Sequence, residues 1–134
     1  MPKFKFKTTT DRKEANMATD EDKGRLDAAF IKAVKDRNYS TAFNLISKVK
    51  DINVRDPETN ATALHFAAAR NALPLLTELE KQSELNYLAR DQEGRYPSEL
   101  AWHIAHNEEL GHHLQQAESE YAAKHGLKTW PKPN

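Results

Sequence analysis

Six histidines are the side chains of this 134-residue sequence with the clearest capacity for chemistry. Four of them gather near the C-terminus: His103, His106, His112 and His113. The i, i+3 spacing of the first two can place both imidazoles on one helix face, and a neighbouring helix could add a third, as in a zinc site. The sequence has no His-Glu-x-x-His motif and no cysteine to complete such a set. The alternative function is that of a His-dependent metal-binding protein or hydrolase that uses these four histidines. Because the motif is missing, we expect instead that the histidines are exposed to solvent or cap helices and bind no metal.

Other catalytic patterns are missing from the sequence. The absence of cysteine excludes disulfides, thiolate metal sites and cysteine nucleophiles. None of the four glycines has the spacing of a phosphate-binding loop. The acid pairs Glu108-Glu109 and Glu118-Glu120 are explained by compensation of a helix dipole and by surface solvation. We therefore expect a protein without catalytic activity and without a cofactor.

Charge and hydropathy restrict the partners and the compartment. The 20 basic and 20 acidic side chains balance, and the pI is near 7.0, which argues against a nucleic-acid partner. No apolar run approaches the roughly 20 residues of a membrane span, and the N-terminus lacks the continuous apolar stretch of a secretory signal. We expect one cytoplasmic domain with no membrane partner.

Six short helical segments are predicted between residues 19 and 127. Capping and breaking residues mark their ends: Thr19, Asn38, Ser40, Thr62, Asn71, Pro74, Pro97, Asn107 and Gly126. Because the links within each pair have only a few residues, the paired helices must be antiparallel. Extended, turn-rich stretches separate the pairs. Residues 1–18 and 128–134 are expected to be flexible tails on either side of a domain at 19–127.

The paired unit repeats three times along the chain, and its central copy carries a motif. Residues 62–68 read Thr-Ala-Leu-His-Phe-Ala-Ala, and residues 91–97 keep Asp-x-x-Gly-x-x-Pro. The chain resembles the ankyrin-repeat family over about residues 20–125, although Ala63 stands where the family has proline and Glu99 where it has histidine. The resemblance implies an all-α ankyrin-repeat solenoid of about three helix-turn-helix units with short β-hairpin-like fingers. It also implies that His65 hydrogen-bonds across the finger turns.

Ankyrin-repeat proteins bind mostly protein partners on the concave face made by finger tips and inner helices. The family's variable positions, carried over, give these partner-binding candidates: Lys35, Asp36, Arg55, Pro57, Glu58, Ala69, Arg70, Arg90, Gln92, Glu93, Arg95 and His103. Four are arginines, a residue type that is enriched at interfaces and forms bidentate hydrogen bonds with carboxylates. We therefore expect a monomeric adaptor or inhibitor whose protein partner has an acidic surface. The competing interpretation is that these are solvated charges of the fingers, which contribute little to folding.

Three further apolar features need an explanation. Trp102 follows a small residue of the expected inner helix and is predicted to cover the last helix interface. Trp130 and the Phe4-Phe6 pair lie in the expected tails, where they are either packed back or available to a partner.

Overall fold

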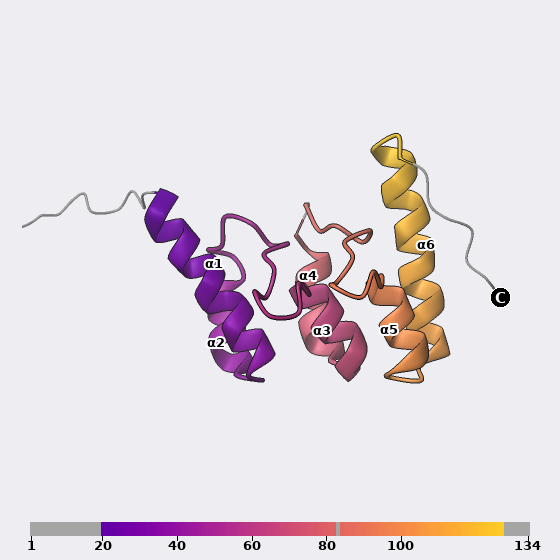
Figure 1. The fold of residues 1–134 in the computed structure, drawn as a ribbon, viewed down its shortest axis with the longest axis horizontal. Helices are drawn as coiled ribbons and strands as arrows, with labels where there is room; N and C mark the ends of the chain where they lie inside the picture. Colours follow the sequence, from indigo (N-terminus) through magenta and orange to yellow (C-terminus); the bar gives the residue numbers. More distant parts are fainter. Residues whose placement is uncertain (1–19, 83, 128–134) are drawn as a thin grey trace, which may run out of the picture.

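The computed structural model describes residues 20–82 and 84–127, which form three helix pairs side by side (Figure 1). The pairs are α1 (Asp20–Lys35) with α2 (Tyr39–Leu45), α3 (Ala63–Arg70) with α4 (Leu73–Glu80), and α5 (Pro97–His103) with α6 (Glu108–Lys124). The described part of the chain contains no strand, so the all-α prediction is confirmed and the fingers are turns rather than β-hairpins. The predicted tails, with Thr19, Trp130 and the Phe4-Phe6 pair, lie outside the described residues.

Short-range capping determines where the central helices begin and end. The Thr62 hydroxyl caps α3 by accepting the N–H of His65, and Asn71 ends α3 in the left-handed conformation, with φ of 56°. The Asn107 side chain accepts the N–H of Leu110, 3.0 Å away, at the start of α6. These predicted ends are confirmed because each requires only groups a few residues apart.

Two predicted ends, at Asn38 and Ser40, differ in detail. Asn38 was expected to end the first helix and Ser40 to begin the second, but α1 ends at Lys35, α2 begins at Tyr39, and the Asn38 side chain caps α2. At the end of α6, Gly126 has φ of 65° and the Leu127 N–H donates to the Ala122 carbonyl over 2.7 Å, as in a Schellman motif. Leu127, which follows this glycine, is 51% exposed.

The pairs pack through two rows of helices. The inner helices α1, α3 and α5 contact one another in sequence, and the outer helices α2 and α4 contact each other behind them. Small residues with no exposed surface, such as Ala63, Ala67 and Ala101, allow the helices to approach closely, while Leu64 and Leu76 are 1% and 5% exposed. Both leucines therefore lie in the core. No described helix has the length and apolar character needed to cross a membrane.

Two fingers project from the same side of the helix rows: finger 1 (residues 51–61) and finger 2 (residues 84–95) (Figure 1). A buried aspartate organises each one. Asp56 accepts the N–H and hydroxyl of Thr59 at 3.0 and 2.8 Å, and Asp91 accepts the N–H groups of Glu93 and Arg95 at 2.9 and 3.0 Å. The long helices α1 and α6 reach beyond the middle pair on the finger side (Figure 1). The fingers are thus flanked by helices at both ends of the molecule.

Candidate functional site

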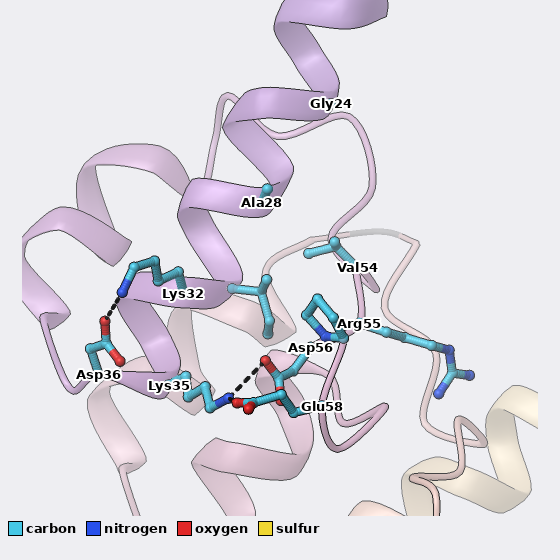
Figure 2. Close-up of a pocket in the computed structure, with 11 residues that line it drawn as sticks. Gly24, Ala28, Lys32, Lys35, Asp36, Val54, Arg55, Asp56 and Glu58 are labelled. Atoms are coloured by element: carbon cyan, nitrogen blue, oxygen red, sulfur yellow. Dashed lines mark hydrogen bonds and ion pairs between the residues drawn. The ribbon is translucent and has the colours of Figure 1, made fainter.

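A groove of about 640 Å³ lies between α1 and finger 1 (Figure 2). Five of the twelve predicted partner-binding residues line it: Lys35, Asp36, Arg55, Pro57 and Glu58. Lys35 is the last residue of α1, Asp36 follows it directly, and the others come from the finger, so residues about 20 positions apart in the sequence meet at one surface. The groove is therefore the best-defined part of the predicted binding face.

The walls of the groove are largely apolar. Ile31 lies on the helix side, and Val54 and Pro57 lie on the finger side. Gly24 and Ala28, one helical turn apart, leave α1 with little side-chain bulk, and a Cβ added at Gly24 would meet nothing within 4 Å. The groove thus exists because α1 carries small residues where it faces Val54 and Pro57.

The charged residues at the edge of the groove pair with one another. Lys32 Nζ of α1 lies 2.6 Å from Oδ2 of Asp36, the residue that follows the helix. Lys35 reaches across to finger 1, where its Nζ contacts Glu58 and lies 3.2 Å from Asp56 Oδ1 (Figure 2). The two ion pairs that Lys35 makes, with Asp56 and with Glu58, connect the end of α1 to the finger.

The titration of this ion pair follows from its contacts. The hydrogen bond to Glu58 is the main cause that raises the pKa of Lys35, and Asp56 adds to it. Burial would raise the pKa of Asp56, but the hydrogen bonds from Thr59 and Lys35 outweigh burial and hold this pKa below its usual value. Both groups are therefore charged at neutral pH.

Two of the predicted arginines are bonded to carbonyl groups of neighbouring units. Arg70 Nη1 and Nη2 donate to the carbonyl oxygens of Val34 and Lys35 at 2.6 and 2.7 Å, at the C-terminal end of α1. Arg55 Nη1 donates to the Arg90 carbonyl of finger 2 at 2.6 Å. Arg70 thus connects the second helix pair to the first, and Arg55 connects the two fingers, and neither role was predicted from the sequence.

The other two arginines are engaged within finger 2. Arg95 pairs with Asp91 at 2.9 Å and with Glu93 at 2.8 Å. Arg90 lies over the Tyr96 ring, 4.8 Å from its centroid, and donates to the Tyr96 hydroxyl at 2.9 Å. These four arginines are therefore not merely solvated charges, since all of them make bonds within the chain.

The remaining predicted residues do not join the groove. Gln92 and Glu93 are exposed in finger 2, Ala69 is half-buried in α3, and His103 is exposed at the end of α5. The apolar wall of the groove, which includes Gly24, Ala28 and Val54, was not predicted from the sequence. The i, i+4 spacing of the two small residues was the available signal, but only the contact between α1 and finger 1 makes that face a groove.

The four C-terminal histidines are not brought together. His103 is exposed, and His106 occupies the left-handed turn between α5 and α6 with φ of 54°. His112 packs edge-on against Trp102, with ring centroids 4.8 Å apart, and His113 Nε2 lies 2.7 Å from Glu80 Oε2. Among residues 20–82 and 84–127, no three His, Cys, Asp or Glu side chains are placed to hold a metal ion.

One predicted surface carboxylate is buried. Glu118 is 3% exposed and accepts a hydrogen bond from the hydroxyl of Ser98, which has no exposed surface. The solvation expected for the Glu118-Glu120 pair is therefore wrong for Glu118, because α5 packs over this position of α6.

A second cavity, of about 330 Å³, lies between finger 2 and α6. Glu80 Oε2 there accepts the Tyr87 hydroxyl at 2.9 Å and faces His113 Nε2. Burial, helped by the hydrogen bond to Glu80, raises the pKa of the Tyr87 phenol well above its usual value. These polar groups satisfy one another and connect α4, finger 2 and α6.

No protein-family model matches this chain. A stretch of 72 residues, 53% of the chain, is 40% identical to part of a Dictyostelium discoideum protein described as "Probable serine/threonine-protein kinase". The matched stretch spans 7% of the length of that protein. The similarity therefore concerns a short segment of a much longer relative.

Proposed function

We propose that this chain is a protein-interaction module of the ankyrin-repeat type, an adaptor or inhibitor that binds a protein partner through finger tips and inner helices. The observation that carries the proposal is the repetition of one helix-pair unit at an interval close to the family's period of about 33 residues. The helices α3 and α5 begin at Ala63 and Pro97, and α2 and α4 at Tyr39 and Leu73, each 34 residues apart (97 − 63 and 73 − 39). Stacked units of this kind bury their apolar faces only against their neighbours.

The contacts between units support this proposal. His65 Nε2 lies 2.9 Å from the Arg95 carbonyl oxygen, so a helix of one unit is bonded to the following finger, as the resemblance implies. The Gln92 N–H donates to the Thr59 carbonyl at 2.9 Å, which joins the two fingers directly. Rigid fingers of this kind present their tips with little loss of conformational entropy on binding.

The proposal includes no catalysis. Of the four histidines of the alternative function, His112 packs on Trp102 and His113 faces Glu80, and the acid Glu118 is bonded to Ser98. The kinase description belongs to a relative of which the match covers 7%, so we do not extend that activity to this chain.

Site-specific photocrosslinking tests the proposed function. A photoreactive phenylalanine placed at Pro57 or Gln92, both exposed at finger tips, is expected to capture one and the same protein in cells expressing the chain. The matched control positions are Ser47 and Lys81, which are exposed after the outer helices α2 and α4. Equal capture from all four positions, or none from the finger tips, would exclude the concave face as the binding surface.

A further inference from the structure

We propose that the groove between α1 and finger 1 receives an uncharged, apolar segment of the partner protein, anchored by one large aliphatic or aromatic side chain. This inference rests on the proposed function and specifies the chemistry of the partner. It differs from the acidic partner that the four arginines suggested.

The charges of the groove exclude a charged occupant. Its lining carries three basic side chains, Lys32, Lys35 and Arg55, and three acidic ones, Asp36, Asp56 and Glu58. Both lysines are already paired with these carboxylates, and Arg55 Nη1 donates to the carbonyl oxygens of Asn60 and Arg90. An acidic segment would meet the carboxylates of Asp36 and Glu58, and a basic one would meet the lysines. Because like charges placed together oppose association, an uncharged segment is the complementary one.

The shape of the groove accepts a bulky apolar side chain. Its volume of about 640 Å³ falls within the roughly 300–1,000 Å³ typical of sites that enclose a ligand. Ala28 and Pro57 are exposed and Val54 is half-buried, so apolar surface on both walls is available to an incoming side chain. The ion pair of Lys35 with Asp56 and Glu58 lies at one end, and Gly24 at the other end of the α1 wall leaves room for the segment to continue (Figure 2).

The second cavity is less suited to a partner, because one of its two carboxylates, Glu80, is already bonded to Tyr87 and faces His113. Its polar groups therefore offer less to an incoming ligand than the walls of the groove.

Selection from a displayed library of random peptides tests this inference with the full chain. The peptides retained are synthesised with a fluorescent label, and their affinities are measured by fluorescence anisotropy. We expect them to be uncharged and to carry Phe, Trp, Leu or Ile, and their dissociation constants should change less than about twofold between low and high salt, since screening acts on charges. Selection of acidic peptides whose binding weakens steeply with salt would overturn the inference while leaving the proposed function intact.

Two matched substitutions locate the binding site. Ala28→Trp fills the groove and is expected to weaken binding at least about tenfold, which corresponds to about 1.4 kcal/mol. Ala29→Trp places the same bulk on the next exposed residue of α1, which does not line the groove, and should leave affinity within about twofold. Unfolding midpoints of both variants check that the fold is retained. Peptides that bind the Ala28→Trp variant normally, or a selection without binders, would refute the groove as their site.

The chain's own N-terminal phenylalanines are the competing occupant. If the double variant Phe4→Ser and Phe6→Ser bound the selected peptides about tenfold more tightly, the segment that fills the groove would belong to this chain rather than to a partner. Unchanged affinity is the result expected from our proposal.

Discussion

The Nε2 of His65 lies 2.9 Å from the carbonyl oxygen of Arg95, 30 residues further along the chain. This nitrogen must carry the proton, because a carbonyl oxygen only accepts. The opposite ring nitrogen, Nδ1, is then free of a proton and accepts the N–H of Thr62 at 3.1 Å and its hydroxyl at 2.9 Å. One neutral imidazole thus joins the cap of α3 to the turn of finger 2.

Replacing His65 with Ala should strongly destabilise the fold. The substitution removes the acceptor of the buried Thr62 N–H and hydroxyl, and it removes one of the two donors to the Arg95 carbonyl, which keeps the Asp91 N–H. A buried group left unsatisfied costs about 1–3 kcal/mol. We expect the free energy of unfolding to fall by about 2–4 kcal/mol in urea titrations. The exposed His103→Ala is the control and should change it by less than about 0.5 kcal/mol. Similar effects of the two substitutions would contradict the role assigned to His65.

His65 should also make stability depend on pH. Burial is the main cause that lowers the pKa of His65 in the folded protein, whereas the unfolded chain has the ordinary value of about 6.5. Below about pH 6.5 the unfolded state therefore binds more protons, and stability falls by up to about 1.4 kcal/mol per pH unit until the folded pKa is reached. Unfolding measured from pH 8 to pH 5 should show this loss, and His65→Gln should reduce it. An equal reduction by His103→Gln would show that the loss of stability at low pH does not come from His65.

Leu64 and Leu76 should each contribute strongly to the free energy of unfolding, because both are buried. Changing either to Ala removes buried methyl groups and leaves a cavity, with an expected loss of about 2–5 kcal/mol. Leu73, which is 45% exposed, is the matched control, and Leu73→Ala should cost less than about 1 kcal/mol. Chemical denaturation compares the three variants, and equal losses would show that the helix register is wrong.

Gly111 should resist substitution although it lies inside a helix. A Cβ at this position would lie 2.5 Å from Trp102 Nε1, so Gly111→Ala should cost about 1–3 kcal/mol of overpacking. In a Trp102→Leu background the same change should be neutral, or stabilising by up to about 1 kcal/mol, because alanine favours helix over glycine. A double-mutant cycle of unfolding free energies measures this coupling. Additive effects would mean that the contact has no energetic consequence.

Arg70 should contribute to stability as well as to any binding surface. Arg70→Ala removes the donors to the last carbonyls of α1 and is expected to cost about 1–2 kcal/mol. Arg70→Lys retains the charge but not the two-pronged geometry, and should recover only part of this loss. Thermal unfolding of both variants tests whether the two parallel hydrogen bonds of the Arg70 guanidinium stabilise the fold. Full recovery by lysine would assign the effect to charge alone.

Helix ends and pairing could be predicted from the sequence because their causes are local. Thr62 caps α3 through a residue three positions away, and Asn107 does the same for α6. Asn38 was assigned to the wrong helix because an asparagine in a short link is suited both to ending one helix and to starting the next. The 34-residue interval and the burial of Leu64 likewise follow from the order and periodicity of the residues.

Long-range contacts decided what the charged residues do. Arg70 bonds to carbonyls about 35 positions earlier, and Glu118 is buried by Ser98, 20 positions away, so neither result is visible in local patterns. The groove also depends on a long-range contact, because Ala28 of α1 lines it together with Val54 of finger 1. The sequence alone determined which segments are helical and how they are paired, since these depend on backbone bonds over three or four residues. Only the tertiary structure determined which charges are neutralised within the chain and which apolar surface remains available, because both depend on how units distant in the sequence pack.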